Sequence, residues 1–377
     1  MRKFTVVCDP ISEKASVQFG VLKMIIKALD NENEIKVISP YIPEEIASKL
    51  ARMGNISIIS TSSVNKVQKF IFSILGNNEA MLWGISWLFE AFFSLNSSIT
   101  RKNTCDENSI VLNASYTAPV KCKLFWNQAT PPLITLSNMG KTNMLAHILY
   151  LFGRRILTAM DNKVSRKHFQ FSEKFVNNSR YLKELYEELG HQSTEVLHTP
   201  KEFSEFNPPR KPPTRDYVLA YIGKEVEIDT ILELADKGIK IVSFGAKLPF
   251  GVPVAELKRR AGFLGFVDDN KLSELYYNAL YTAFPFTDEP FGWVPLESMQ
   301  HGTAVLSYNK QGPSETILDG KTGWLTDNKE AFLEKGIKIW NLGTSDISPT
   351  DCMDRVKDFT VKPIADRLNE LLAGEDH

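Results

Sequence analysis

Short apolar runs that alternate with helical patterns constrain the fold of this chain more than any other feature. Runs rich in β-branched residues occur in both halves of the 377 residues, at 4–8, 35–39, 56–60, 110–113 and 123–126, and again at 217–223, 240–245, 281–286 and 304–308. Stretches with helical periodicity separate several of them, at 17–29, 229–236, 271–280 and 295–301. Strands that alternate with helices favour parallel, doubly wound sheets, so we expect an α/β protein.

A proline-rich window divides the chain. Residues 199–216 are polar and hold five prolines, which predicts a linker between two domains, although a long surface loop within one domain is an alternative. We expect an N-terminal domain over 1–198, a C-terminal domain over 217–350, and a last segment, 351–377, that forms a helix packing back on the N-terminal domain. Because ligands bind beyond the carboxyl ends of the strands in such sheets, we expect the site in a cleft between the two domains.

The composition excludes several classes of protein. The 44 Lys and Arg residues balance the 45 Asp and Glu residues, for a net charge of −1, so the chain lacks the basic field of a general nucleic-acid binder. The four cysteines show no CxxC spacing that would hold zinc or a redox pair. The first apolar run is too short for a signal peptide, and the most apolar stretch, 81–95, is shorter than the ~20 residues of a spanning helix. We therefore expect a cytoplasmic protein.

The stretch from Phe286 to Glu297 is the most informative part of the chain. A buried strand is expected to end at Phe286 and a helix to start near Val294, with a proline and a glycine in the turn between them. The free N–H groups and the positive dipole end of such a helix start bind anions. Diphosphate is a natural occupant of this site.

Two carboxylates, Glu289 and Glu297, flank this anion site. Carboxylates do not pair with phosphate, so their natural partners are hydroxyl groups. Two of them beside an anion site suggest a ligand with phosphates in the middle and a sugar on each side, which describes a nucleotide sugar. Each glutamate alone has a simpler explanation, because the helix dipole favours an acid such as Glu297 in a first turn and Glu289 fits an ordinary exposed loop.

The run from Glu289 to Leu325 resembles the retaining glycosyltransferases of family 4, also called group 1. It shows their motifs in order, as Glu-x7-Glu at 289–297, Gly-Thr-x-Val at 302–305, Gly-Pro-Ser-Glu at 312–315 and Asp-Gly-x-x-Gly at 319–323. The resemblance implies the GT-B fold, in which two doubly wound Rossmann-like domains face a central cleft. It also implies a microbial or archaeal hexosyltransferase acting on a lipid-linked glycan, as in protein glycosylation.

The resemblance implies roles for single residues. Glu289 would contact hydroxyls of the donor sugar, Glu297 the ribose hydroxyls and Lys224 the diphosphate, which makes Glu289 and Lys224 the candidate catalytic residues. The other candidates for donor binding are Gly20, Lys247, Phe266, Phe291, Gly292, Trp293 and Val294.

The chain departs from the family pattern at several positions. Lys224 stands where arginine is usual, which keeps the charge and loses the bidentate fork. The lysine usual shortly afterwards is absent, and Lys247 is either its substitute or a solvated loop residue. Gly20 replaces a Gly-Gly loop, and it either approaches the phosphate or only starts a helix. The usual acceptor-side histidine is absent, and Asn127 and Gln128 are the acceptor-binding candidates, unless they only form a turn after a strand.

The implied mechanism is same-face attack within an oxocarbenium-like ion pair, in which the departing phosphate oxygen takes the acceptor's proton. Catalysis then rests on positioning and on stabilising the charge of the leaving group. A covalent intermediate on Glu289 is the alternative. The sequence holds no Asp-x-Asp triplet, so we expect no metal and no cofactor, with a UDP- or GDP-linked sugar as co-substrate.

Two segments of the first half point to a membrane partner. Residues 67–95 hold seven Phe and Trp residues, and 147–168 carry five basic residues against one acid. A basic helix beside an apolar segment is typical of a protein that lies on an anionic membrane, although a buried core helix or a dimer interface is an alternative. We expect a lipid-linked or glycan acceptor and a peripheral place on the cytosolic face of the membrane. The alternatives are the same chemistry on a soluble sugar or polysaccharide, and a non-catalytic subunit that binds nucleotide sugars.

Overall fold

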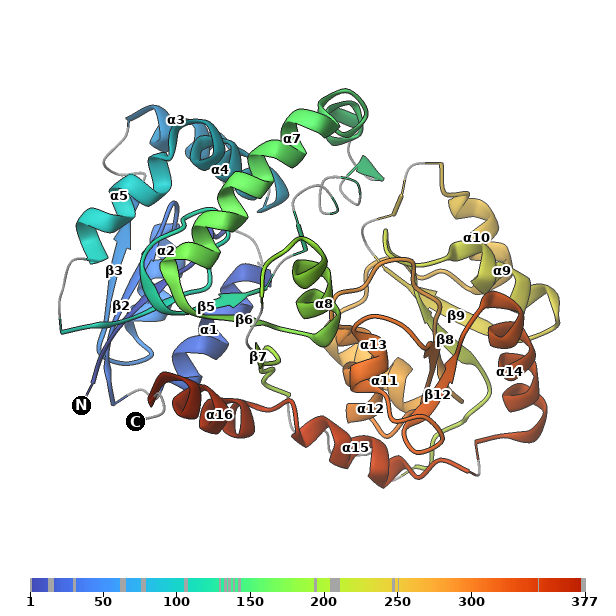
Figure 1. Ribbon diagram of the computed structural model, residues 1–377. Helices are drawn as coiled ribbons and strands as arrows, with labels where there is room; N and C mark the ends of the chain where they lie inside the picture. The colour runs from blue at the N-terminus through green and yellow to red at the C-terminus, as the bar shows by residue number, and fades with distance from the viewer. Residues whose placement is uncertain are drawn as a thin grey trace.

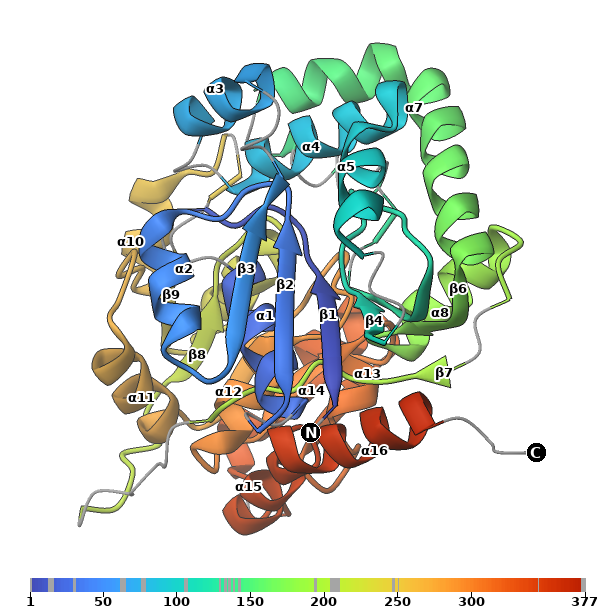
Figure 2. The same cartoon turned by 90° about the vertical axis from the view of Figure 1, so that its left-hand side faces the viewer.

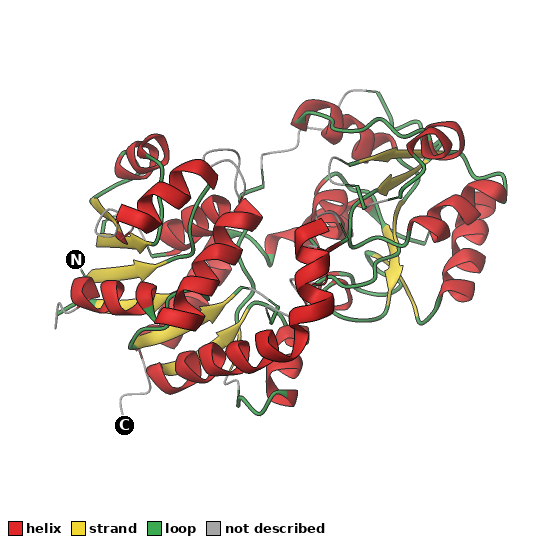
Figure 3. Cartoon of the chain, turned by 90° about the horizontal axis from the view of Figure 1, so that it is seen from above, coloured by secondary structure: helices red, strands yellow, loops and turns green. Residues whose placement is uncertain are grey.

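Two lobes lie side by side, one for each half of the chain, and each is a parallel sheet with helices on its faces (Figures 1 and 3). The computed structural model describes residues 2–12, 17–29, 32–61, 66–75, 79–104, 108–128, 130–131, 134, 137, 140–141, 144–192, 195–203, 211–245, 248–249, 251–344 and 346–373.

The first lobe is built on a seven-stranded sheet of order β3-β2-β1-β4-β5-β6-β7. All its pairings are parallel, with Val6 of β1 opposite Val37 of β2, for example. The strands are β1 (Lys3–Val7), β2 (Glu34–Ser39), β3 (Ile56–Ser60), β4 (Ile110–Asn113), β5 (Cys122–Asn127), β6 (Ser172–Asn177) and β7 (Glu195–Val196).

Helices cover both faces of this sheet. One core cluster joins the central strands to α1 and α2, and another joins the opposite face to α4, α7 and α8. The helices of this lobe are α1 (Val17–Ala28), α2 (Glu44–Ala51), α3 (Lys66–Leu75), α4 (Glu79–Phe93), α5 (Leu95–Thr104), α7 (Met144–Phe171) and α8 (Arg180–Glu188).

The second lobe has a five-stranded parallel sheet of order β12-β11-β10-β8-β9. Its strands are β8 (Val218–Tyr221), β9 (Ile241–Phe244), β10 (Thr282–Phe284), β11 (Val305–Tyr308) and β12 (Gly323–Thr326). Its helices are α9 (Ile228–Asp236), α10 (Val254–Ala261), α11 (Asp269–Asn278), α12 (Trp293–Gln300), α13 (Pro313–Thr316), α14 (Lys329–Leu342) and α15 (Pro349–Lys357).

The chain returns to the first lobe through its last described helix, α16 (Val361–Ala373). Leu368 and Leu371 of α16 are buried in the same core cluster as α1, and Figure 2 shows α16 beneath the sheet of the first lobe. The segment in which we expect one helix therefore holds α16 and most of α15, and Cys352 and Val356 of α15 pack in the core of the second lobe.

The predicted α/β fold with two doubly wound sheets is confirmed. Three strands, β6, β7 and β12, are not anticipated from apolar runs. The first half of β6, Ser172 to Lys174, is polar and only partly buried, so it carries no clean pattern. β7 has only two residues, too few to form a pattern. β12 opens on Gly323, which adds nothing to an apolar run; a Cβ there would lie 2.2 Å from the carbonyl oxygen of Val305.

Candidate active site

The loop that follows β10 is the segment that the sequence predicts to form the centre of the site. Gly292 lies just before α12 with φ +93°, a conformation that only glycine adopts without strain. Pro295 is the third residue of α12, where its missing N–H costs nothing, because the first N–H groups of a helix have no partner within it. The helix therefore starts, beyond the end of the strand, with N–H groups that no carbonyl of the helix accepts.

The turn after β8 lies against this loop. The N–H of Thr287 donates to the carbonyl of Glu225 at 2.6 Å, and Val226 forms an isolated bridge with Phe286. Because β8 and β10 are neighbours in a parallel sheet, their carboxyl ends meet at one edge. Lys224 is thereby brought beside the loop of Glu289, and its ammonium has no ion pair or hydrogen bond among the described residues.

Glu289 folds back onto the start of α12. Its Oε1 accepts the N–H of Gly292 at 3.0 Å and that of Phe291 at 3.3 Å. These are two of the N–H groups that we expect to meet sugar and diphosphate, so a ligand oxygen has to share them with Glu289. Burial and the nearby carboxylate of Glu225 raise the pKa of Glu289 to about 7, although the two backbone donors lower it.

Glu297 is held by a residue that sequence reasoning missed. Its Oε1 forms an ion pair with Lys201, and its Oε2 accepts the hydroxyl of Tyr276 at 3.3 Å. Lys201 lies on the crossover between the lobes, with its ammonium 5.2 Å from the ring centre of Trp293. Lys201 falls in the window 199–216, which the sequence predicts to be a linker, and no motif drew attention to it.

Loops of the two lobes meet at Glu315, on α13. Its carboxylate accepts the backbone N–H of Arg180 at 2.8 Å and of Tyr181 at 3.0 Å, at the start of α8. The hydroxyl of Tyr181 also donates to Asp288 at 3.2 Å. Sequence reasoning singled out Glu315 as part of a motif and assigned it no role; in the structure it joins the two lobes.

His198 lies behind this contact. Its Nδ1 pairs with the carbonyl of Asn178 at 2.9 Å, and its ring centre is 5.3 Å from that of Phe291. Burial lowers the pKa of His198, which disfavours a charged ring, although the carboxylate of Glu315, 4.0 Å from Nε2, acts in the opposite direction.

The other candidates on the donor side fall in different places. Phe266 is 80% exposed in the turn from Leu264 to Val267, and this turn is fastened to the end of β9 by the N–H of Gly245, which donates to Gly265 at 2.9 Å. Lys247 lies outside the described residues.

The candidates of the first lobe show mixed environments. Gly20 is exposed in α1, and a Cβ added there meets nothing within 4 Å. Asn127 is 1% exposed and donates to Asn177 at 2.8 Å, so it faces the interior of the lobe. Gln128 is partly exposed, and its Oε1 accepts the hydroxyl of Thr199.

A surface of the first lobe exposes many large apolar side chains. Figure 2 shows α3, α4 and the first part of α7 along one edge of the lobe. We call these side chains the apolar edge: Val67, Phe70 and Ile74 on α3, Phe92 and Phe93 on α4, and Met144, Ile148, Leu151, Phe152 and Ile156 on α7. Arg154 and Arg155 are exposed beside them on α7. No helix in the described part of the chain is long and apolar enough to span a membrane.

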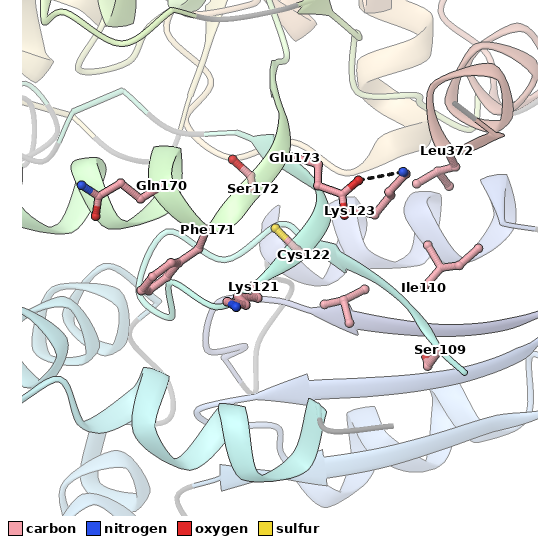
Figure 4. Close-up of a pocket in the computed structure, with 11 residues that line it drawn as sticks. Ser109, Ile110, Lys121, Cys122, Lys123, Gln170, Phe171, Ser172, Glu173 and Leu372 are labelled. Atoms are coloured by element: carbon pink, nitrogen blue, oxygen red, sulfur yellow. Dashed lines mark hydrogen bonds and ion pairs between the residues drawn. The ribbon is translucent and has the colours of Figure 1, made fainter. Parts of the chain in front are cut away.

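An open groove elsewhere in the first lobe offers no chemistry. It lies at the start of β4, β5 and β6, the edge opposite their carboxyl ends, and Lys123 and Glu173 form an ion pair in it (Figure 4). Burial raises the pKa of Cys122 in this groove to about 12, so its thiol stays protonated and unreactive. Within the described ranges, no group of three or more His, Cys, Asp or Glu side chains could hold a metal ion.

The known families and proteins that this chain resembles are glycosyltransferases. Residues 254–346 match the family of glycosyl transferases group 1. The chain is 34% identical over 110 residues to an alpha-1,3/1,6-mannosyltransferase of Neurospora crassa, which covers 27% of this chain and 23% of the relative. It is 40% identical over 84 residues to a lipopolysaccharide core biosynthesis mannosyltransferase of Rhizobium leguminosarum, covering 22% of this chain and 23% of the relative. The matches thus span about a quarter of each curated relative.

Solved structures resemble the whole chain. The crystal structure of Alr3699/HepE of Anabaena, in complex with UDP and glucose, superposes with a TM-score of 0.64 at 13% identity and covers 98% of this chain and 99% of its own. Sucrose-phosphate synthase of Thermosynechococcus elongatus gives a TM-score of 0.62 at 12% identity, over 99% and 98% of the two chains. At these identities the likeness concerns the fold, which is GT-B.

Proposed function

We propose that this chain, which has the GT-B fold, is a group 1 glycosyltransferase that transfers a hexose from a nucleoside-diphosphate sugar to a lipid-linked glycan, with retention of the anomeric configuration. The observation that carries the proposal is the edge where β8 and β10 end. There Lys224, the start of α12 and the carboxylate of Glu289 lie on adjoining loops, and Glu297 lies within α12.

Each group has a task in this proposal. Lys224 and the N–H groups at the start of α12 stabilise the negative charge that develops on the departing diphosphate. Glu289 holds hydroxyls of the donor sugar, and a carboxyl with a pKa of about 7 both donates and accepts hydrogen bonds near neutral pH. Glu297 accepts the ribose hydroxyls while Lys201 and Tyr276 keep its carboxylate in place.

The proposed reaction needs no side-chain base and no metal. As the bond between the sugar and the phosphate breaks, the phosphate oxygen takes the proton of the attacking hydroxyl, which enters on the same face. Glu289 as a covalent nucleophile is less well supported, because a carboxyl group whose pKa is raised to about 7 is partly protonated near neutral pH, and only the carboxylate can attack. Positioning and charge stabilisation then supply the rate enhancement.

The donor and acceptor classes rest on the relatives and on the apolar edge. The curated relatives are named as mannosyltransferases, and a structural neighbour holds UDP and glucose, so the donor is a GDP- or UDP-linked hexose. The apolar edge, with Arg154 and Arg155 beside it, supports peripheral contact with an anionic membrane, in which a lipid-linked acceptor would reside. We place the protein on the cytosolic face.

Donor binding followed by turnover tests this function. The full chain is melted with UDP, GDP, UDP-glucose and GDP-mannose, because a ligand at 100 times its Kd stabilises a protein by ~2.7 kcal/mol. The protein is then incubated with the sugar nucleotide that shifts its melting temperature and with polyprenyl-diphosphate-linked oligosaccharide in vesicles. The anomeric configuration of the product is determined by NMR. We expect one nucleotide class to bind, Glu297→Ala to abolish the shift, and the product to retain the configuration.

A matched variant keeps this test specific. Glu330→Ala removes another glutamate from the first turn of a helix in the same lobe, α14, where it is exposed, and should leave the shift intact. No shift with any of the four nucleotides would refute the transferase proposal.

A further inference from the structure

Gln311, just before α13, has an unusual backbone conformation. Its φ is +52°, in the left-handed region that side chains other than glycine avoid. Among the described residues, only Ser94 and Arg215 share a positive φ without being glycine. Of the three, Gln311 alone contacts the loop of Glu289. Backbone strain of this kind persists only where the surroundings hold it, and it gathers at functional sites.

The side chain of Gln311 holds the backbone of Glu289. Its Oε1 accepts the N–H of Glu289 at 2.7 Å, and the N–H of Gly312 donates to the carbonyl of Glu289 at 3.1 Å. The two peptide groups that flank Glu289 are therefore both fixed by one short segment. A glycine at position 311 would adopt the same backbone without strain, but it has no side chain to accept the first of these bonds.

The segment itself cannot shift easily. A Cβ on Gly312 would lie 2.2 Å from the Cα of Phe291, so the two loops are in direct backbone contact. The carbonyl of Gln311 accepts the hydroxyl of Ser314 at 2.7 Å, which ties it to the start of α13. These contacts tie the position of Glu289 to α13. The same helix carries Glu315, which contacts the first lobe.

We propose that Gln311 is a positioning residue of the donor-sugar site: its amide oxygen fixes the peptide of Glu289 so that the carboxylate meets the hydroxyls of the transferred sugar. This inference rests on the proposed function, since it assumes that Glu289 contacts that sugar. The neutral amide suits the task, because Glu225 and Asp288 already place negative charge beside Glu289. An acid at position 311 would add to it.

Three variants separate the hydrogen bond, the strain and the charge. Gln311→Gly removes the bond and relieves the strain, Gln311→Ala removes the bond and keeps the strain, and Gln311→Glu keeps an acceptor oxygen and adds a charge. Each is measured by calorimetry with UDP, GDP, UDP-glucose and GDP-mannose, and by kcat and KM with the sugar nucleotide that the wild type uses.

We expect the affinity for UDP or GDP to stay within twofold in all three variants, because Gln311 is tied to the sugar side of the site. In Gln311→Gly and Gln311→Ala, kcat should fall about tenfold, the factor that corresponds to ~1.4 kcal/mol, while Gln311→Gly melts at the higher temperature of the two. Gln311→Glu places a further carboxylate beside Glu289, so the pH dependence of its kcat should lie at higher pH than that of the wild type. Ser94→Gly, which relieves a positive φ far from Glu289, should leave kcat unchanged.

Two outcomes overturn the inference. A Gln311→Gly enzyme with wild-type kcat and wild-type preference between UDP-glucose and GDP-mannose would show that the side chain only occupies a turn. Loss of UDP or GDP binding together with sugar binding would show a collapse of the loop. Failure of the proposed function looks different, because then Glu289→Gln itself leaves turnover unchanged, or the wild type turns over no donor.

Discussion

The carboxylate of Glu315 accepts the backbone N–H of Tyr181 at 3.0 Å, although the two residues belong to different lobes. The same carboxylate accepts the N–H of Arg180, and the hydroxyl of Ser179 accepts that of Leu182. A residue of the second lobe thus completes the cap of a helix in the first, because the opening turn of any helix leaves N–H groups without partners. The relative placement of the lobes is coupled to this cap.

Replacing Glu315 should loosen the contact between the lobes. In Glu315→Ala, two backbone donors lose a charged acceptor, and the expected cost is about 1.5–3 kcal/mol of unfolding free energy. Urea unfolding followed by tryptophan fluorescence measures it, and small-angle scattering should report a larger radius of gyration. Glu330→Ala, at an exposed first-turn position of α14, is the control. An unchanged radius of gyration would mean that other contacts alone hold the lobes.

Gly312→Ala should damage both folding and activity. The added Cβ meets backbone atoms of Phe291 at 2.2 and 2.4 Å, which cannot rotate away as a side chain does. Overpacking of this kind costs about 1–3 kcal/mol, and the loop of Glu289 has to move. Thermal unfolding and donor turnover measure the two effects.

A second glycine provides the comparison for Gly312. Gly84 lies within α4 with nothing within 4 Å of an added Cβ, so Gly84→Ala should stabilise the chain by about 0.5–1 kcal/mol. If both variants melted like the wild type, the close approach of Gly312 to Phe291 would not exist in solution.

Gly20→Ala distinguishes the two interpretations of Gly20. Alanine is the better helix former, and its Cβ meets no atom of the protein within 4 Å. The unfolding free energy should therefore increase by about 0.5–1 kcal/mol, and the melting temperature should rise with it. If Gly20 approaches the donor phosphate, kcat/KM falls at the same time, because only the ligand is crowded. Wild-type kcat/KM in this more stable variant would assign the glycine to the helix alone.

The dependence of stability on pH should carry a contribution from Glu289. The pKa of Glu289 is about 7 in the folded chain and 4.5 for an unperturbed glutamate side chain, as in the unfolded chain. The folded state therefore binds the proton more tightly. Its stabilising contribution is therefore complete below pH 4.5 and is lost as the pH rises through 7. Glu289→Gln has no such loss, and its unfolding free energy relative to the wild type should increase between pH 4.5 and 7.5. Asp161, with a pKa of about 7, acts in the same direction and cancels in this difference; parallel curves would contradict the prediction.

Phe152→Ser should weaken binding to membranes. Phe152 is the most exposed residue of the apolar edge, at 85%, and burying such a side chain contributes about 1.5–3 kcal/mol. The fraction that sediments with vesicles of equal parts phosphatidylglycerol and phosphatidylcholine should fall at least tenfold. Leu342→Ser, at a position 71% exposed in the second lobe, should sediment like the wild type. Equal sedimentation of all three proteins would remove the membrane from the proposal.

Much of the second lobe could be predicted from local sequence. The predicted strand 304–308 contains β11, the predicted helix 295–301 overlaps α12, and the turn between β10 and α12 follows from the glycine and proline in it. These features depend on neighbours along the chain, whose periodicity and conformational preferences act without the rest of the fold. The strands of the first lobe were predicted less completely, because β6 follows the 28 residues of α7 and opens with polar residues.

The sequence by itself determined the two parallel sheets, the helix start after Gly292 and the order of the site motifs, because hydrophobic periods and turn residues are local properties. Only the tertiary structure decided which side chains meet. Lys201 pairs with Glu297 across 96 residues, and Glu315 caps α8 across 135. Such contacts are set by how the sheets and the crossover bring distant segments together, and no spacing along the chain encodes that distance.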